Sequence, residues 1–337
     1  MKTVKLGKTG ITTPQNAFGA LPIQRIDKEA AAYLLRKAYD NGMTFFDTAR
    51  AYSDSEEKMG YAFKGMREKI TIATKTMAQT PEDFWKDLET SLKTLGTDHV
   101  DIYQFHCVGK CWRPGDGSGM YEAMLEAKKK GMILHIGVTA HLIGVAEELV
   151  ESGLYETIQY PFSYISSDRD IALVEKSRQA DMGFIAMKGL AGGLLTNSKA
   201  CMAFMSQFDN VVPIWGVQRE NELDEWLDFF EDAPVLDDEM RALIEADKKE
   251  LSGDFCRGCG YCQPCTSGII ISQCARWSQM VRRAPSEAWL SDFWRAELEK
   301  TTKCTGCGVC MTRCPYKLNI PQLLKKNYAD YKNNFCG

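Results

Sequence analysis

The feature that most constrains this chain is an alternation of short apolar or β-branched runs with amphipathic helical segments, repeated eight times before residue 236. We expect strands at 16–19, 44–47, 70–75, 101–106, 135–139, 157–161, 183–188 and 211–217. Each is followed by apolar residues spaced three and four apart, which is typical of a helix packed on one face. No glycine-rich phosphate loop follows the first strand, so the pattern favours an eight-stranded parallel β/α (TIM) barrel over an open doubly wound sheet.

Two further segments flank this alternation. Residues 2–5 and 11–13 predict an N-terminal β-hairpin, since Gly7 and Gly10 supply turn conformations that other residues resist. After the last barrel helix the strand signal ends, and a second module begins near Ser252. We therefore expect three parts, which are a barrel domain at 1–236, a charged helical linker at 237–251 and a small, mostly α-helical domain at 252–337.

Composition and charge limit the class of protein, its partners and its location. The chain has 337 residues, of which 45% are hydrophobic and 26% charged, an ordinary globular balance. Its formal net charge of -4 gives no general attraction to nucleic acid or to anionic membranes, so neither is expected as a partner. Because the sequence shows neither the apolar run of a signal peptide nor a stretch long enough to cross a bilayer, we expect a soluble, cytoplasmic protein.

Thirteen cysteines are the second strong signal, because clustered cysteines in a reducing compartment indicate metal binding rather than disulfides. Eight of them form two runs, spaced C-x2-C-x2-C-x2-C and C-x2-C-x2-C-x3-C, the second followed by proline. These eight are Cys256, Cys259, Cys262, Cys265, Cys304, Cys307, Cys310 and Cys314. The second run is typical of bacterial ferredoxins, in which three cysteines bind one 4Fe-4S cluster and the fourth binds the other cluster of a pair.

Two runs predict two 4Fe-4S clusters. By this analogy Cys314 completes the cluster of the first three cysteines, and Cys265 completes the cluster of Cys304, Cys307 and Cys310. The first run departs from the pattern, since Thr266 stands where proline is usual, and this leaves the partition of ligands open. Two structural zinc sites are the alternative, although triplets of cysteine ending in Cys-Pro favour iron and sulfur.

Ionisable side chains fall at the carboxyl ends of three successive strands. Asp47, Lys75 and His106 end the second, third and fourth expected strands, and Tyr52 lies on the loop after the second. Barrels assemble their active sites at these strand ends. We expect Lys75, paired with Asp47, to favour the Tyr52 anion and lower a phenol pKa that is normally about 10, while His106 orients a substrate oxygen. For Asp47 and Tyr52 taken alone, a helix-capping Asp and a half-buried Tyr is an equal alternative.

Two neighbouring segments have simpler interpretations. Ser53 and Glu56 predict a capping box for the helix after the second strand. A glycine-rich insertion at 108–119, flanked by Cys107 and Cys111, follows directly after the fourth strand, and we interpret it as a mobile substrate loop. We expect the five cysteines outside the two runs to bind no metal, namely Cys107, Cys111, Cys201, Cys274 and Cys336.

About the first 230 residues resemble the aldo-keto reductase superfamily, and the matching stretches 5–10, 46–52, 74–75 and 103–106 contain all four ionisable residues. In that family the tyrosine is the general acid, the lysine and aspartate tune it, and the histidine positions the carbonyl. The two cysteine runs, separated by a helical segment that contains Trp277, Trp289 and Trp294, resemble the α-helical ferredoxin-like module that one branch of the family carries.

The resemblance implies hydride transfer between a nicotinamide cofactor and an aldehyde or ketone. The cofactor contacts that it implies are Thr139, Gln159, Lys188, Gly216, Gln218 and Arg219. Thr139 stands where the family has serine, whereas Ala140 and Met187 replace its usual Asn and aromatic residue. Gln218 fills the position of a basic residue for the 2′-phosphate of NADPH, with Arg219 beside it, so both NADP and NAD remain open as the cofactor.

Together these features predict a cytoplasmic, anaerobic, NAD(P)H-linked oxidoreductase in which Tyr52 is the general acid and two 4Fe-4S clusters relay electrons. A hydride carries two electrons and each cluster passes one, so the expected partners are a small carbonyl or alcohol substrate and a ferredoxin or flavodoxin carrier. Two alternatives stand beside this hypothesis: a carbonyl reductase with purely structural clusters, and a nicotinamide-binding redox sensor without turnover. The substrate itself is set by loops that the sequence does not explain.

Overall fold

The computed structural model describes residues 1–251, 255–283 and 286–336. The described chain forms two compact units, one made of Met1–Gly189 with Ser198–Asp237, and the other of Leu190–Asn197 with Asp238–Gly337. The boundary predicted at Ser252 lies outside the described residues, and the three predicted domain ranges stay predictions. None of the described helices is both long and apolar enough to cross a membrane.

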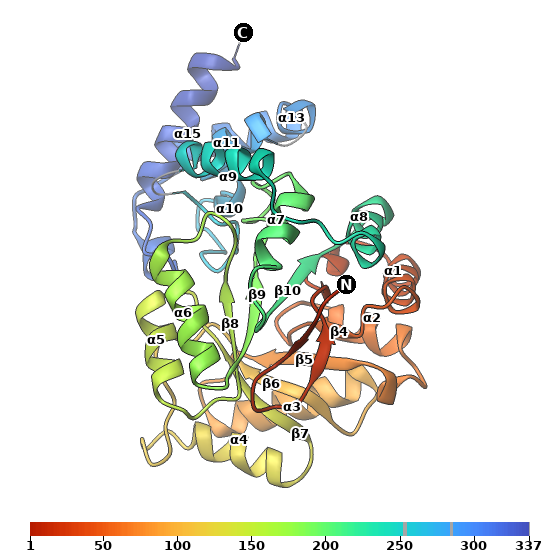
Figure 1. Cartoon of the computed structure of the whole chain (residues 1–337). Helices are drawn as coiled ribbons and strands as arrows, with labels where there is room; N and C mark the ends of the chain where they lie inside the picture. Colours follow the sequence, from red (N-terminus) through yellow and green to blue (C-terminus); the bar gives the residue numbers. More distant parts are fainter. Residues whose placement is uncertain (252–254, 284–285, 337) are drawn as a thin grey trace. The chain divides into compact units, whose positions relative to one another are not determined.

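The first unit is a closed barrel of eight parallel strands, as predicted (Figure 1). The strands are β3 (Ala17–Gly19), β4 (Phe45–Asp47), β5 (Thr71–Thr76), β6 (Val100–Phe105), β7 (Ile133–Thr139), β8 (Thr157–Pro161), β9 (Gly183–Met187) and β10 (Val211–Gly216). Each strand pairs with the next along the chain, and β10 closes the barrel on β3 through the register Gly216 to Gly19. All eight strands therefore point their carboxyl ends toward the same rim.

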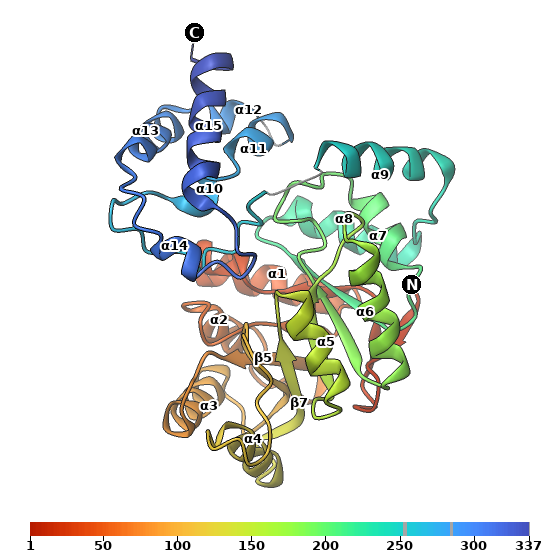
Figure 2. The same cartoon turned by 90° about the vertical axis from the view of Figure 1, so that its left-hand side faces the viewer.

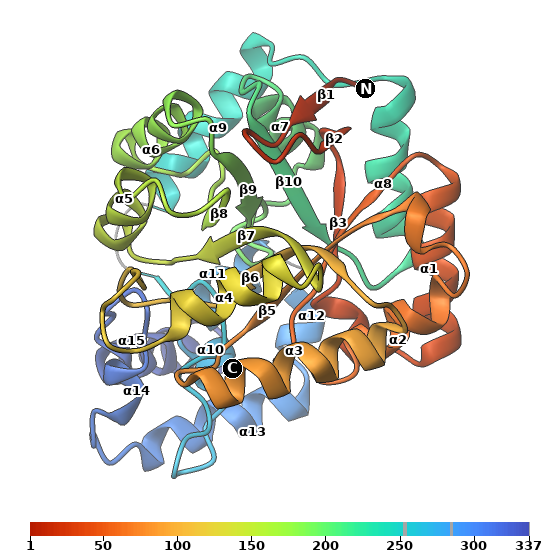
Figure 3. The same ribbon diagram turned by 90° about the horizontal axis from the view of Figure 1, so that it is seen from below.

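Helices follow the strands and lie outside them, as Figure 3 shows. They are α1 (Lys28–Asp40), α2 (Ser55–Ala62), α3 (Pro81–Leu95), α4 (Met120–Lys129), α5 (Ile143–Glu151), α6 (Asp168–Gln179), α7 (Ser198–Met205) and α8 (Glu220–Glu231), with short 3-10 turns at Pro22–Arg25 and Arg67–Lys69. Local signals set their ends. Thr80 caps α3 through its hydroxyl, Pro81 opens it, and Gly96 ends it with a φ of 69°.

The predicted hairpin, β1 (Thr3–Lys5) with β2 (Thr12–Pro14), packs against the amino ends of the barrel strands. Its Val4 and Leu6 belong to the same buried cluster as Phe45 and Ile185 from β4 and β9. Gly7 bridges to the chain before β9, where a Cβ atom would lie 2.3 Å from the Asp181 carbonyl oxygen, and it adopts a φ of 50°. The hairpin thus covers the rim opposite to the one that carries the candidate catalytic residues.

The second unit is helical (Figure 2). Its helices are α9 (Asp238–Glu250), α10 (Ile271–Cys274), α11 (Trp277–Arg283), α12 (Ser286–Trp289), α13 (Asp292–Lys300), α14 (Val309–Thr312) and α15 (Ile320–Asn334), with a 3-10 turn at Thr301–Lys303. Trp277 is fully buried and packs edge-on against Tyr331 and Phe335 of the terminal segment. Cys256 and Cys262 lie in the same core. The small, mostly helical second module predicted from the sequence is confirmed.

Candidate functional sites

An ion pair between Lys75 and Asp47 lies at the centre of the carboxyl-end rim. The Lys75 Nζ is 2.6 Å from Asp47 Oδ1 and donates a second hydrogen bond of 2.6 Å to the Thr48 carbonyl oxygen. Both ionised side chains are almost completely removed from solvent. The Nε2 atoms of Gln104 and Gln159, from β6 and β8, donate to the Asp47 carboxylate at 3.4 Å each. The carboxylate therefore accepts hydrogen bonds from side chains of three strands, β5, β6 and β8.

Burial acts on the two partners in opposite directions. Removal from water raises the pKa of Asp47 and lowers the pKa of Lys75, while their mutual attraction works against both shifts. The amide donors of Gln104 and Gln159 also favour the ionised carboxylate. Neither charge is stable at this depth without the other, so the pair acts as one unit.

Tyr52 and His106 lie beside this pair. The Lys75 Nζ is 5.1 Å from the centre of the Tyr52 ring. The Tyr52 and His106 rings meet edge-on, with 5.7 Å between their centres and 81° between their planes. His106 follows β6, and its amide donates to the Thr76 carbonyl oxygen at 2.8 Å. All four residues that the sequence singled out are therefore brought together, although their catalytic roles stay predictions.

The expected direction of the Tyr52 pKa is wrong. We predicted that Lys75 would lower it, but burial of the phenol raises the pKa of Tyr52, and the charges of Asp47 and Cys107 raise it further. The phenol consequently keeps its proton at neutral pH, which suits an acid rather than a base. For His106, burial and the positive charges of Lys75 and Lys188 hold its pKa well below the ordinary value, so the ring is neutral.

Two of the residues expected to bind the nicotinamide already form hydrogen bonds within the protein. The Thr139 hydroxyl, at the end of β7, accepts the backbone amide of Cys107 at 2.6 Å. Gln159 accepts from Gln104 at 3.0 Å while its own amide group faces Asp47. Lys188 follows β9 in a left-handed conformation, with a φ of 59°, and its charge acts on His106. Thr139 retains a hydroxyl hydrogen, so its side chain still fits a carboxamide oxygen.

The segment after β10 differs from what we expected for a phosphate site. Gly216 is exposed, and the amides of Gln218 and Arg219 both donate to the Glu222 carboxylate, at 3.0 Å and 3.1 Å. The Arg219 guanidinium pairs with the same carboxylate at 3.2 Å. Sequence reasoning missed Glu222, whose position three residues after Arg219 was the available signal. A 2′-phosphate at this position would have to compete with an internal carboxylate.

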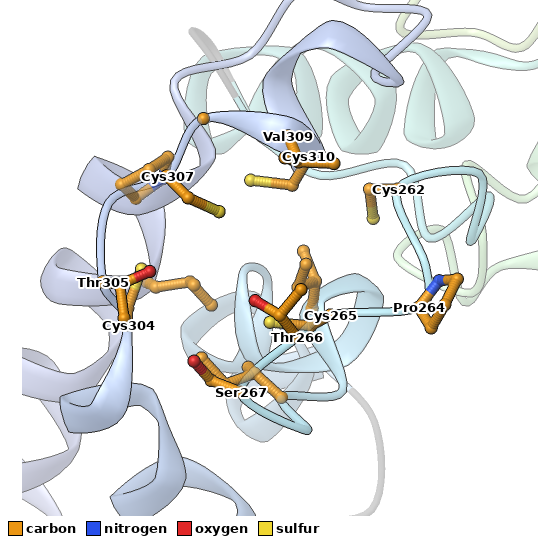
Figure 4. Close-up of a pocket in the computed structure, with 15 residues that line it drawn as sticks. Cys262, Pro264, Cys265, Thr266, Ser267, Cys304, Thr305, Cys307, Val309 and Cys310 are labelled. Carbon is orange, nitrogen blue, oxygen red and sulfur yellow. The ribbon is translucent and has the colours of Figure 1, made fainter.

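Five cysteines line one pocket in the second unit (Figure 4). They are Cys304, Cys307 and Cys310 of the second run and Cys262 and Cys265 of the first. Within the described ranges, no three His, Cys, Asp or Glu side chains converge on a single ion position. Thiolates spread around a hollow suit a cluster, in which each binds a different iron, better than one tetrahedral zinc. The residues present therefore fit an iron–sulfur cluster.

The remaining three cysteines of the two runs, Cys256, Cys259 and Cys314, interact electrostatically with Cys262 or with one another. Burial raises the pKa of Cys256, and the neighbouring Cys259 and Cys314 raise it further. Burial also raises the pKa of Cys262 to about 12, with added contributions from Cys256, Cys259 and Cys314. The charge of Cys314 thus acts on cysteines of the first run, whereas Cys262 and Cys265 of the first run line the pocket of the second. The partition of ligands between two clusters stays a prediction.

Glycines shape both cysteine loops in the same way. Each run reads C-x-G-C-G-x-C, and the four glycines have φ values of 67°, 81°, 67° and 76° at Gly258, Gly260, Gly306 and Gly308. Residues with a Cβ resist this left-handed region. The repeated glycines let the backbone of each loop turn sharply between successive cysteines.

Comparison with known proteins finds two family matches along the chain. The model of the Aldo/keto reductase family matches residues 15–211, and that of a 4Fe-4S dicluster domain matches residues 255–319. Among curated proteins, the uncharacterized oxidoreductase YrpG of Bacillus subtilis is 30% identical over 226 residues, covering 58% of this chain and 68% of YrpG. The aldo-keto reductase YhdN of the same organism is 27% identical over 215 residues, and the match covers 58% of this chain and 64% of YhdN. The chain thus spans about two thirds of the length of these relatives.

Solved structures share the barrel. An aldo-keto reductase from Klebsiella pneumoniae, described as a complex with NADPH, superposes with a TM-score of 0.60 at 21% identity. The match covers 73% of this chain and 94% of that protein. At this level of identity the likeness shows the fold, and the residues of the rim carry any argument about chemistry.

Proposed function

Because this chain belongs to the aldo/keto reductase family, we propose that its barrel interconverts an aldehyde or ketone and an alcohol, with Tyr52 as the general acid. The observation that carries this proposal is the convergence of Asp47, Lys75, Tyr52 and His106 on one rim. A bound nicotinamide dinucleotide would supply or accept the hydride, and the NADPH complex of the Klebsiella protein supports this choice. Thr139, Gln159 and Lys188 would hold it.

Each residue of the rim has a distinct part in the proposal. Tyr52, whose pKa is raised by burial, retains the proton that a carbonyl oxygen needs as it becomes an alkoxide. The neutral His106 ring, edge-on to Tyr52, orients that oxygen. The ammonium of Lys75, fixed by Asp47 and by the Thr48 carbonyl, places a positive charge where negative charge develops.

For the second unit, we propose two 4Fe-4S clusters that exchange electrons with a ferredoxin or flavodoxin. Cys304, Cys307, Cys310 and Cys265 would hold one, and Cys256, Cys259, Cys262 and Cys314 the other. The match to a dicluster domain supports the pair. Because Cys256 and Cys262 are part of the hydrophobic core of this unit, a purely structural role for the clusters is the second candidate.

The test is an anaerobic stopped-flow experiment on the cluster-loaded full chain. NADH or NADPH is mixed with the protein, with and without a panel of aldehydes and ketones, while nicotinamide and cluster absorbance are followed together. Carbonyl-dependent nicotinamide oxidation supports the reductase, and cluster bleaching supports the relay. Turnover with clusters that never change redox state would leave only the structural role, and binding without turnover of any carbonyl would indicate a redox sensor.

A further inference from the structure

A thiol and an imidazole that the proposed reduction does not use face each other beside its residues. Cys107 follows His106 at the end of β6, and His141 follows β7. The Cys107 Sγ lies 3.3 Å from His141 Nδ1. His141 is 5% exposed, whereas Cys107 is half-buried.

The backbone holds this thiol in an uncommon conformation. Cys107 has a φ of 54°, in the left-handed region that residues with a side chain seldom adopt. Two hydrogen bonds to Thr139 maintain it, from the Cys107 amide to the hydroxyl at 2.6 Å and from the Val108 amide to the carbonyl oxygen at 2.9 Å. Backbone strain of this kind is enriched at functional sites.

The surroundings of the pair suit a reaction with a carbonyl compound. Burial, Lys188 and His106 hold the pKa of His141 well below the ordinary value, so the imidazole is neutral at rest. Its Nδ1 lies 3.3 Å from the sulfur, within reach for passing a proton transiently between the thiol and a carbonyl oxygen. Cys107 directly follows His106, whose ring meets the Tyr52 ring edge-on with 5.7 Å between their centres. The thiol therefore belongs to the same strand end as the residue proposed to orient the substrate oxygen.

We propose that Cys107 captures aldehydes reversibly as a hemithioacetal, with His141 Nδ1 receiving the thiol proton. The Sγ–C bond forms as the carbonyl π bond opens, and the proton passes from the thiol through His141 to the carbonyl oxygen. The step needs no oxidant or reductant, and its reversal returns the aldehyde to the rim. Aldehydes react in this way more readily than ketones, so the inference narrows the substrate class. Only this restriction of the substrate class to aldehydes rests on the proposed function.

The direct probe is 13C-labelled propionaldehyde, added to the cluster-loaded full chain without any nicotinamide and followed by 13C NMR. Apart from the adduct at the exposed Cys336, which Cys336→Ala removes, we expect a hemithioacetal carbon signal that saturates at one per chain. Cys107→Ser and Cys107→Ala should abolish it, and Cys111→Ala, which removes a buried thiol of the same loop, should retain it. His141→Gln should slow iodoacetamide alkylation of Cys107 by about tenfold, as peptide mass spectrometry measures.

Absence of the adduct in the unmodified chain, or its persistence in both Cys107 variants, would overturn the inference. Steady-state kinetics separate it from the proposed function. If aldehydes are reduced but the labelled adduct never forms, capture fails while the reductase stands. If the adduct forms but no nicotinamide is consumed, the reductase fails and capture stands. If the chain both captures aldehydes and reduces them, Cys107→Ser should raise KM for aldehydes several-fold and leave KM for ketones unchanged.

Discussion

The ammonium of Lys75 lies 2.6 Å from the carboxylate of Asp47, and both groups are buried between the ends of β5 and β4. This contact joins two neighbouring strands of the barrel and places a fixed charge 5.1 Å from the centre of the Tyr52 ring. Stability and catalysis therefore depend on the same pair, and the two contributions can be separated experimentally.

Removing one partner should destabilise the barrel strongly. Lys75→Met leaves the Asp47 carboxylate buried without its counter-charge, which costs about 3–5 kcal/mol in comparable cases. The shift of the urea unfolding midpoint of the cluster-loaded chain measures this cost. The double variant Asp47→Asn with Lys75→Met should recover much of it, because neither charge remains. Equal destabilisation by the single and double variants would show that the ion pair is not the cause.

Replacing the phenol alone should remove activity and leave the fold intact. Tyr52→Phe keeps the ring that meets His106 but deletes the proposed acid, so kcat for carbonyl reduction should fall by about 10²–10⁴-fold. Tyr61→Phe, at an exposed tyrosine of α2, is the matched control and should leave kcat unchanged. Comparable kcat values for the two variants would exclude Tyr52 as the acid.

The pH profile of reduction follows from the shifted groups. Reduction needs protonated Tyr52, whose pKa is raised by burial, and neutral His106, whose pKa burial lowers. The phenol and the imidazole should therefore cause no loss of rate as pH rises from about 6.5 toward 10, the ordinary values of these side chains. A loss of rate at high pH should come from the Lys75 ammonium, whose pKa burial lowers, and a loss at low pH from His106 as it gains a proton. A decline of kcat/KM between pH 7 and 9 that is accompanied by the ultraviolet absorbance of a phenolate would instead indicate a lowered pKa of Tyr52.

Substituting the glycines of the cysteine loops should reduce the iron–sulfur content to different extents. At Gly258 an added Cβ would lie 2.7 Å from the Arg276 guanidinium in addition to adopting a φ of 67°. At Gly306 the φ is also 67°, but an added Cβ would have no atom from outside its own chain neighbours within 4 Å. Gly258→Ala should consequently lose more iron and acid-labile sulfide per chain than Gly306→Ala. The reverse order would mean that crowding beside the first run does not control cluster assembly.

Much of this architecture could be predicted because it depends on periodicity. Apolar spacing along the chain identified eight strands and the helices after them, since each element buries one face. The tetrad could be predicted for a related reason: residues that end successive parallel strands, such as Asp47 and Lys75, must meet at one rim.

What could not be predicted depends on the environment of single side chains. Ser53 and Glu56 looked like a capping box, yet Asp54 precedes α2 and the Glu56 carboxylate is buried, accepting from the Thr74 hydroxyl at 2.6 Å and pairing with Arg50. Such a contact joins α2 to β5, so patterns within the helix do not reveal it. The raised pKa of Tyr52 was missed for the same reason, because burial follows from packing.

The central claim is that this barrel transfers a hydride to a carbonyl carbon while Tyr52 provides the proton. The most direct measurement is a single-turnover reaction with 4-deuterated NADH or NADPH and an aldehyde, with mass spectrometry of the alcohol product. Our account predicts one deuterium per molecule on the former carbonyl carbon, formed quickly by the unmodified chain and about 10²–10⁴-fold more slowly by Tyr52→Phe. An alcohol without deuterium from either 4-position, or equal rates in the two proteins, would contradict it.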